Sequence, residues 1–333
     1  MHVHKDINQL PAFINAVITI GTFDGVHTGH QQIIELMKQE AKAIGGETII
    51  ITFHPHPRQV ISNKSKPVYL LNTLEEKIAL LKKYGIHHVV IIPFTEAFAN
   101  QSAEQYIADF LVKTFKPHTI IIGHDHRFGK DRAGDYSLLE DKAALYNYVV
   151  KEIPGYMLHN STISSTKIRE ALLNNDIATA NQFLGYSYFF SGSVIEGNKL
   201  GRTIGYPTAN LKVEDEYKLV PGNAVYAVEV FLEKGNIGSD ESELLMLHSP
   251  LSTETPASNA MFKGMMNIGV RPTVDGTTRM IEVNIFDFDE EIYGRQLTVF
   301  IKRQLRSEIK FNGLDALKQQ LAKDKTEALK YLS

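Results

Sequence analysis

The stretch from Gly21 to His30, which reads GTFDGVHTGH, constrains the fold more than any other part of the chain. Residues 17–20 before it are apolar and mostly β-branched, which is typical of a buried strand. A helical period follows in the apolar residues Ile33, Ile34, Met37, Ala41 and Ile44. The stretch is therefore predicted to be a strand-to-helix turn, the place where open α/β sheets bind ligands.

Two features of this turn suit a ligand that carries phosphate. The free N–H groups and the positive dipole end of the following helix would point toward the turn. His27 and His30, with Gly29 between them, can both face the same site. The spacing fits neither the Walker A loop nor the GxGxxG pattern. A turn shaped by glycine and histidine without any ligand is the structural alternative.

Strands and helices alternate through the rest of the first half. Residues 48–53, 88–94 and 119–122 have strand composition, and capping boxes begin helices after Thr73 and Ser102. The first of these helices is expected to bury Leu74, Ile78 and Leu81. The alternation predicts a doubly wound parallel sheet, with polar turns after Ile20 and Ile122 at the carboxyl ends of strands.

Two further polar clusters belong to this half. Residues 54–58 follow a strand and contain two prolines, so they form either a rigid turn with incidental histidines or part of a site. Ser164, Ser165 and Thr166 begin a helix and are followed by Arg169. A helix cap needs one hydroxyl rather than three, but a capping role alone stays open.

Length and charge limit the class of protein. With 333 residues, the chain is long enough for two domains. Its hydrophobic content of 43% and charged content of 22% are those of a globular protein. The net charge is −3 and basic residues form no long clusters, so neither nucleic acid nor an anionic membrane is expected as a partner. The sequence indicates no particular oligomeric state.

The chain has no cysteine, which excludes disulfides, thiol catalysis and cysteine metal sites. Residues 1–10 lack the apolar core of a signal peptide. No apolar run approaches the roughly 20 residues that a membrane helix needs. A cytoplasmic location is therefore expected.

A change of pattern marks a domain boundary at Gly185, a residue suited to a helix C-cap. Residues 1–185 and 186–333 are predicted to form separate domains. In the second, residues 191–195, 225–231, 280–286 and 297–301 alternate with a period of two, which predicts a small β-barrel. A terminal amphipathic helix is predicted to pack on this barrel through Leu314, Leu317, Leu321, Ala328 and Leu329.

Polar residues gather near the ends of the barrel strands. Gly197, Gly201 and Gly205 precede the sequence YPTAN at 206–210, and spaced glycines of this kind form turns more often than phosphate sites. Alternation places Glu282 on the face opposite to Ile281 and Val283. The pattern alone leaves Glu282 as a solvated acid.

The motifs of the first half resemble a known family. The string GxFDGVHxGH at 21–30 is similar to the adenylyltransferase half of bacterial bifunctional riboflavin kinase/FAD synthetases. The family patterns FxPHP, GxDFxFG and ISSTxIR follow in order at 53–57, 123–129 and 163–169. One departure is His126, which stands where the family usually has phenylalanine. If that phenylalanine packs against flavin, His126 weakens or alters the contact.

The second half resembles the riboflavin kinase part of the same family. GxxxGRxxG[FY]PTAN covers 197–210, NIGVRPT covers 267–273, and a pattern that begins at Glu282 ends at Gly294. The segment 233–259 is longer than the family leads us to expect and is predicted to be a solvent-exposed insertion.

The resemblance implies roles for individual residues. The implied catalytic residues are Glu282 as the base of the kinase and His27, His30 and Arg169 in adenylyl transfer. Thr208 and Asn210 are implied to hold Mg²⁺ together with ATP. The residues implied to bind nucleotide or flavin are Gly21, Phe23, Asp24, Gly25, Gly29, Asp125, Arg127, Ser164, Ser165, Thr166, Lys199, Gly201, Arg202, Gly205, Thr208, Asn210 and Arg271.

The resemblance implies that the chain phosphorylates riboflavin to FMN and adenylylates FMN to FAD, using ATP and Mg²⁺. The residues agree with the needs of both reactions. The ribityl hydroxyl is neutral and benefits from a carboxylate base, whereas the FMN phosphate is already anionic and needs alignment and positive charge. Two alternatives are another HxGH nucleotidylyltransferase with a different acceptor, and a flavin-binding sensor that has lost catalysis.

Overall fold

The structure is a computed structural model and describes residues 1–61, 67–123, 126–153, 163–197, 200–232, 261–273 and 276–332. It divides into two compact units, Met1–Ser164 and Ser165–Ser333. The first unit ends before Gly185, because the two helices that precede Gly185 belong to the same unit as the barrel. A functional boundary at residue 185 therefore stays a prediction.

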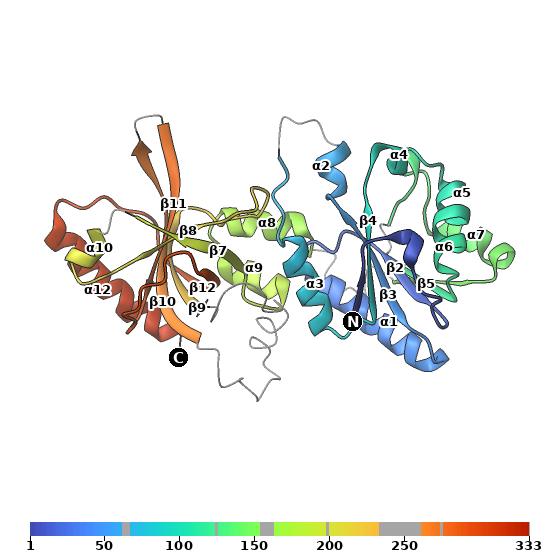
Figure 1. Cartoon of the computed structure of the whole chain (residues 1–333), viewed down its shortest axis with the longest axis horizontal. Helices are drawn as coiled ribbons and strands as arrows, with labels where there is room; N and C mark the ends of the chain where they lie inside the picture. The colour runs from blue at the N-terminus through green and yellow to red at the C-terminus, as the bar shows by residue number, and fades with distance from the viewer. Residues whose placement is uncertain are drawn as a thin grey trace. The chain divides into compact units, whose positions relative to one another are not determined.

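The first unit is built on a parallel six-stranded sheet with the order β1-β4-β3-β2-β5-β6 (Figure 1). Its strands are β1 (His2–His4), β2 (Val17–Ile20), β3 (Thr48–His54), β4 (His88–Pro93), β5 (Thr119–Gly123) and β6 (Val149–Ile153). From β2 the chain steps outward through β3 and β4, and then returns to the other side of β2 through β5 and β6. This reversal between β2 and β5 is the switch point at which such sheets bind ligands.

The helices of this unit are α1 (Thr28–Ile44), α2 (Pro57–Ile61), α3 (Leu74–Lys83), α4 (Glu96–Ala99), α5 (Ala103–Gln105), the π-helical stretch η2 (Tyr106–Val112), α6 (Lys113–Phe115) and α7 (Tyr136–Tyr146). One face of the sheet packs on α5, η2, α6 and α7 through a cluster that includes Ile18, Phe110 and Leu139. Helix α1 buries Ile34, Met37 and Ala41, and it contacts β2, β3 and β5 without joining that cluster. Helices therefore cover both faces of the sheet, as predicted.

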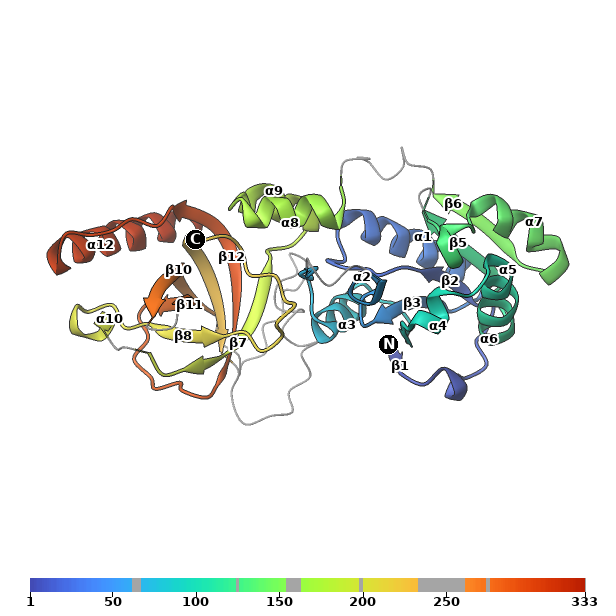
Figure 2. The same ribbon diagram turned by 90° about the horizontal axis from the view of Figure 1, so that it is seen from above.

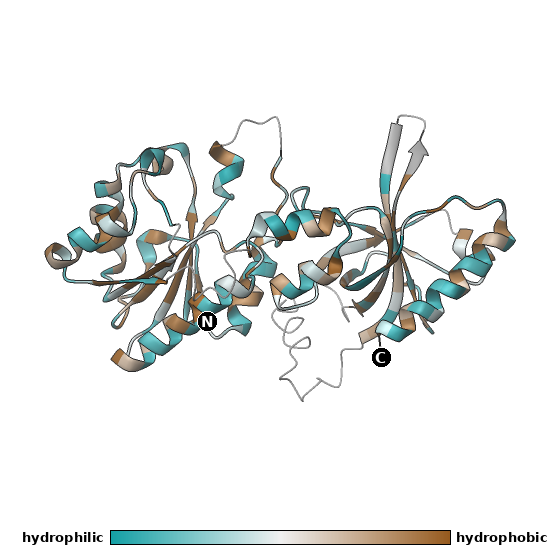
Figure 3. Ribbon diagram, turned by 180° about the vertical axis from the view of Figure 1, so that it is seen from behind, coloured by the Kyte–Doolittle hydropathy of each residue, from teal (hydrophilic) through white to brown (hydrophobic). Residues whose placement is uncertain are grey.

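Helix caps appear where the sequence predicted them. Both Thr73 and Ser102 form complete capping boxes at the starts of α3 and α5. The buried face of α3 differs from the prediction, since Leu74 and Ile78 are only partly buried while Lys77 is buried. Figure 3 shows hydrophobic residues concentrated along the sheet strands and hydrophilic residues on the helices around them.

The second unit begins with α8 (Ser165–Leu173) and α9 (Ile177–Leu184), and Gly185 ends α9 in a left-handed C-cap. A closed barrel follows in the order β10-β11-β8-β7-β12-β9. Its strands are β7 (Phe189–Ile195), β8 (Ala209–Lys212), β9 (Ala224–Leu232), β10 (Met261–Thr273), β11 (Gly276–Ile285) and β12 (Gln296–Arg306), with the short helix α10 (Leu200–Thr203) between β7 and β8. The predicted barrel is thus confirmed.

The terminal helix α12 (Leu314–Tyr331) packs on the barrel beside β10 and β12 (Figure 2). Ala328 and Leu321 contact a small apolar cluster that includes Met265 and Phe286. The predicted apolar face was wrong at its two ends, because Leu314 is 53% exposed and Leu329 is 39% exposed. At the C-terminal end Ala328 and Leu332, four residues apart, form the buried face, and Leu329 lies about 100° around the helix from Ala328. The predicted insertion at 233–259 lies outside the described residues.

Candidate functional site

The turn between β2 and α1 has an unusual backbone. Phe23 and Val26 have positive φ angles of 48° and 36°, although neither is glycine, and Gly25 lies between them at 86°. Left-handed conformations of this kind cost about 1 kcal/mol or more for a residue with a side chain. Both apolar side chains are fully buried. Packing therefore holds the turn in a strained shape that the sequence would not adopt by itself.

The two histidines of this turn stack on each other. The ring centroids of His27 and His30 are 3.7 Å apart with the planes 17° from parallel, and the Phe23 ring lies 4.7 Å from His30. His27 is the N-cap residue of α1, so both rings sit at the positive end of that helix. A Cβ at Gly29 would lie 3.3 Å from the His27 ring, and only glycine leaves the ring this position without displacement.

Burial determines the charge of both rings. It lowers the pKa of His27 to about 4. Burial, with the nearby charges of His27 and Lys77, also lowers the pKa of His30 well below its ordinary value. The Nδ1 atoms of both rings are buried and make no hydrogen bond among the described residues. At neutral pH two uncharged imidazoles thus present unused hydrogen-bonding atoms, and an anion bound beside them would favour protonation.

Asp24 and Lys77 connect this turn to α3. The Asp24 carboxylate accepts hydrogen bonds from the backbone N–H groups of Leu71 at 2.9 Å and Asn72 at 3.4 Å. The Lys77 ammonium donates to the carbonyl oxygen of Thr22 at 2.9 Å. Sequence reasoning missed Lys77, although its place beside Ile78 on the apolar side of a predicted helix was a usable signal.

The loop after β3 contains a short helix that the sequence did not predict. The strand ends at His54 and α2 begins at Pro57. His56 is buried, its ring nitrogen Nδ1 accepts from the N–H of Arg58 at 3.1 Å, and its own N–H donates to Gln59. These contacts support the structural reading of His56 as a residue that starts α2.

The remaining predicted residues of the first half are distributed over two segments. Arg127 lies after β5 and pairs with the carboxylate of Asp135 at 3.6 Å. Asp125 lies outside the described residues. The hydroxyl and arginine cluster lies before and along the start of α8, which groups with the second unit: Ser164, Ser165, Thr166 and Arg169. Their proximity to the histidines stays a prediction.

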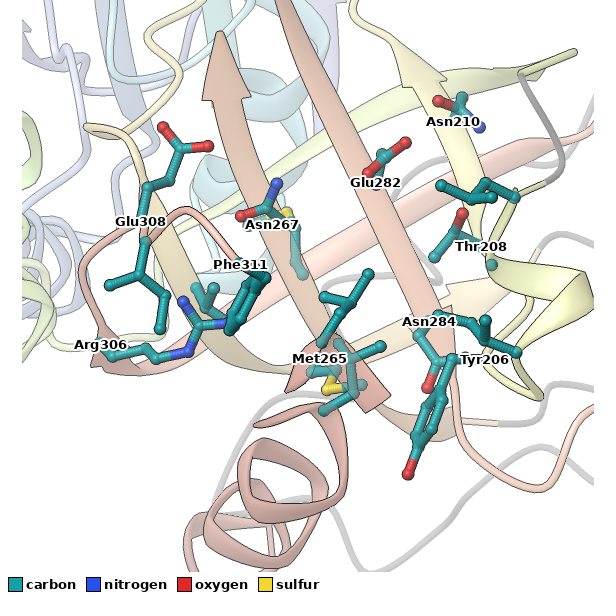
Figure 4. A pocket seen from close by; sticks show the side chains of 18 residues that line it. Tyr206, Thr208, Asn210, Met265, Asn267, Glu282, Asn284, Arg306, Glu308 and Phe311 are labelled. Atoms are coloured by element: carbon teal, nitrogen blue, oxygen red, sulfur yellow. The ribbon is translucent and has the colours of Figure 1, made fainter. Parts of the chain in front are cut away.

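The second candidate site lies on the barrel and joins three sequence motifs. Glu282 on β11 is in register with Asn267 on β10 and with Asn210 on β8. These residues share one face of neighbouring strands, and all three line the same cavity. Figure 4 shows Glu282 between Asn267 and Asn210, with Thr208 nearby. The register therefore places an acid beside two amides that lie far from it in the sequence.

The cavity has a volume of about 190 Å³ and both polar and apolar walls. Arg306 forms part of the wall and is fixed by a two-pronged ion pair with Asp324 of α12, with nitrogen–oxygen distances of 2.8 and 3.0 Å. Further lining residues are Gly201, Tyr206, Thr208, Met265, Asn284, Glu308, Phe311 and Leu321. A flat apolar ring with a polar tail can be accommodated by walls of this composition.

Asn284 holds the segment that leads into β8. Its side-chain amide donates to the carbonyl oxygen of Pro207 at 2.7 Å. Asn284 is buried two residues beyond Glu282 on the same strand, so it faces the same side. It thereby fixes Thr208 relative to Glu282. The period-two alternation of β11 puts Asn284 on the same face as Glu282, but the sequence pattern alone indicates no role for it.

Glycines allow the backbone to approach Asn210 and Tyr206 closely. A Cβ at Gly197 would overlap the Asn210 carboxamide, and a Cβ at Gly201 would overlap the carbonyl oxygen of Tyr206. Gly205 has a φ angle of 81°, which favours glycine. Of the other predicted ligands, Arg202 is exposed on α10, Lys199 lies outside the described residues, and only the backbone of Arg271 is described.

The donor set near Asn210 fits a hard divalent cation. Asn210 is 4% exposed, and its Oδ1 atom is buried without a hydrogen bond among the described residues. The Thr208 hydroxyl adds a second neutral oxygen in the same cavity. The described residues contain no cluster of three or more metal-ligating acids or histidines. Such a pair of oxygens suits Mg²⁺, which keeps several waters and relies on substrate phosphates.

Comparison with known proteins covers both units. Residues 11–167 match the FAD synthetase family, and residues 184–332 match the riboflavin kinase family. A bifunctional riboflavin kinase/FMN adenylyltransferase from Haemophilus influenzae is 36% identical over 92% of this chain and 91% of its own length. The protein of the same name from Bacillus subtilis is 35% identical over 100% of this chain and 96% of its own length.

One solved structure has a similar fold over the whole chain. It is titled macrolide-efflux protein from Streptococcus pneumoniae, and its TM-score is 0.81 with 28% identity over 97% of each chain. Among the residues that our structure describes, no helix has the length and apolar character to span a membrane.

Proposed function

Because the chain belongs to the family of bifunctional riboflavin kinases/FMN adenylyltransferases, and so phosphorylates riboflavin and adenylylates FMN, we propose that each reaction has its own site, one in each unit. Similarity over the full chain favours this function over an HxGH enzyme with another acceptor and over a sensor without catalysis. Riboflavin, FMN and ATP are its small-molecule substrates. Consumption of ATP by both reactions supports a cytoplasmic location, which stays a proposal.

In the barrel, Glu282 is the base of the phosphoryl transfer. Its carboxylate orients the ribityl 5′-hydroxyl of riboflavin and accepts its proton as the oxygen attacks the γ-phosphorus of ATP. ADP leaves and FMN remains. The observation that supports this role is the register of Glu282 with Asn267 and Asn210 at the wall of the cavity.

Thr208 and Asn210 hold Mg²⁺ through their side-chain oxygens. When bound, Mg²⁺ supplies positive charge that neutralises the ATP phosphates. The unused Oδ1 of Asn210 supports this assignment. Asn284 keeps Thr208 in place through Pro207, and the absence of a side chain at Gly197 leaves room for the Asn210 carboxamide.

In the first unit, the β2–α1 turn aligns FMN with ATP. A phosphate oxygen of FMN attacks the α-phosphorus, and pyrophosphate leaves. No base is needed, because the attacking phosphate is already ionised. His27 and His30 donate hydrogen bonds to the phosphates, and the helix dipole of α1 adds positive potential. Roles for Ser164, Ser165, Thr166 and Arg169 in adenylyl transfer are proposed on the family resemblance of the motif at 163–169.

The stacked histidine pair, with two buried and unused Nδ1 atoms, is the observation that supports this second assignment. It is tested with purified full-length chain, riboflavin, ATP and Mg²⁺, with flavins separated by chromatography over time. FMN should rise first and FAD should follow. His30→Ala should still form FMN but no FAD, and an unchanged rate of FAD formation would remove His30 from the proposed mechanism.

A further inference from the structure

Lys77 is a buried cation that neither proposed reaction uses. It lies on the sheet side of α3, and only 7% of its surface is exposed. Its ammonium donates to the carbonyl oxygen of Thr22 at 2.9 Å and to the hydroxyl of Thr52 at 3.3 Å. Both acceptors are uncharged. Burial of an ammonium is unfavourable, and the nearby negative charge of Asp24 offsets part of this cost for Lys77.

The contacts of Lys77 converge on one carbonyl group. The Thr52 hydroxyl, on β3, also donates to the Thr22 carbonyl oxygen, at 3.1 Å. Thr52 is fully buried. Two donors from two different elements therefore hold the same backbone oxygen at the carboxyl end of β2.

Thr22 immediately precedes the strained part of the turn. Phe23 follows with a φ of 48°, and Val26 has a φ of 36°. A backbone in such a conformation persists only where several surrounding contacts hold it in place. The next residues are His27, which caps α1, and His30 in its first turn. A displacement of Thr22 would therefore also displace the rings of His27 and His30.

A second contact joins the β2–α1 turn to the start of α3, and in this contact the turn supplies the side chain. Asp24, from the turn, accepts hydrogen bonds from Leu71 and Asn72, which directly precede α3. Lys77, from α3, donates to the turn. Asp24 of the turn thus binds the backbone just before α3, and Lys77 of α3 binds the backbone of the turn. The turn is fixed on both sides of Phe23.

We propose that Lys77 is a positioning residue for adenylyl transfer, which holds the β2–α1 turn through Thr22 and Thr52 so that His27 and His30 meet the phosphates correctly. The inference rests on the proposed role of the histidines. Burial lowers the pKa of Lys77 to about 8, against the opposing charge of Asp24, so the ammonium is mostly protonated at neutral pH. The positive charge of Lys77 also acts on His30, whose pKa it lowers in addition to the effect of burial.

The test compares two variants. Lys77→Met keeps the length of the side chain and removes its charge and its hydrogen-bond donors. Lys77→Arg keeps the charge and the donors. Rates of FMN adenylylation and of riboflavin phosphorylation are measured separately on the full chain. Lys77→Met should lower kcat for FAD formation about 10- to 100-fold, because small misplacements of catalytic groups have effects of this size. KM for FMN and ATP should change little, and riboflavin phosphorylation should stay at the wild-type rate.

Lys77→Arg should retain most of the FAD-forming activity. A wild-type kcat for FAD formation in Lys77→Met would overturn the proposal, as would an effect on KM alone. His30→Ala separates the proposed role of Lys77 from the proposed role of the histidines. If His30→Ala loses FAD formation while Lys77→Met keeps it, only the role of Lys77 fails, whereas full activity of both variants removes the proposed histidine mechanism as well.

Thr52 provides a second test that does not depend on Lys77→Met folding. Thr52→Val is close to isosteric and removes the hydroxyl, and Thr52→Ser keeps it as the matched control. Thr52→Val should lower kcat for FAD formation, and Thr52→Ser should not. Because both donors act through one carbonyl, the double variant Lys77→Met/Thr52→Val should be little worse than Lys77→Met. Equal activity of Thr52→Val and Thr52→Ser would contradict the proposal.

Discussion

The side-chain amide of Asn284 donates to the carbonyl oxygen of Pro207 at 2.7 Å, and this contact joins β11 to the segment that carries Thr208. Asn284→Asp keeps the shape of the side chain but replaces the donor with a second acceptor. The Pro207–Thr208 segment should then move away, because two oxygens repel. Riboflavin phosphorylation should fall about tenfold or more.

FMN adenylylation by the same Asn284→Asp protein is the control, and it should keep the wild-type rate. A loss confined to the kinase reaction supports a role for Asn284 in positioning. Equal loss of both activities would instead indicate a general defect in folding.

Gly197 lies against the carboxamide of Asn210, so that even a methyl group would overlap it. Gly197→Ala should displace Asn210 and lower kinase kcat about 10- to 100-fold. Gly294 is the matched control, because open space surrounds its missing Cβ although its φ is 77°. Gly294→Ala should reduce stability by about 1 kcal/mol and leave kinase kcat unchanged. Similar kinase rates in both variants would contradict this account of Gly197.

The assignment of Asn210 to Mg²⁺ predicts a change in metal dependence. Asn210→Ala should raise the Mg²⁺ concentration needed for half-maximal riboflavin phosphorylation by about tenfold or more. The Mg²⁺ dependence of FMN adenylylation, measured on the same protein, should not change. Removal of the metal with a chelator should stop phosphorylation in the wild type. An unaltered Mg²⁺ dependence of the variant would exclude Asn210 as a ligand.

Burial of His27 predicts a loss of stability in acid. The unfolded chain protonates this ring near pH 6.5, while the folded chain does so only near pH 4. Between these values the unfolded state binds more protons, so stability is complete above about pH 6.5 and falls as the pH drops toward 4. The shift corresponds to at most about 3 kcal/mol.

The measurement is the free energy of unfolding by urea, followed by circular dichroism, for the wild type and for His27→Gln at several pH values. Glutamine does not titrate, so the variant should lose less stability than the wild type on acidification. Parallel profiles for the two proteins would show that His27 is not the group responsible.

Much of this architecture could be predicted from local pattern. The strand before Gly21, the helix after His30 and both capping boxes depend on contacts near in sequence, and the structure confirms them. Period-two alternation likewise placed Glu282 on the polar face of its strand. These features require only the regular geometry of helices and strands.

Relationships between distant elements could not be read in this way. The row formed by Asn267, Glu282 and Asn210 depends on the register of three strands, which is set by the closure of the barrel. The contacts of the buried Lys77 depend on a carbonyl from the β2–α1 turn and a hydroxyl from β3. In each case the relationship depends on tertiary contacts, which local sequence patterns do not specify.

In the proposed mechanism, one chain performs two reactions at two sites, with a carboxylate base in only one of them. Glu282→Gln tests this claim most directly, with initial rates measured for riboflavin phosphorylation and, separately, for FMN adenylylation. We predict that phosphorylation falls about 100-fold or more, because a positioned base contributes that much, while adenylylation keeps the wild-type rate. Undiminished phosphorylation, or an equal loss of both rates, would contradict the account.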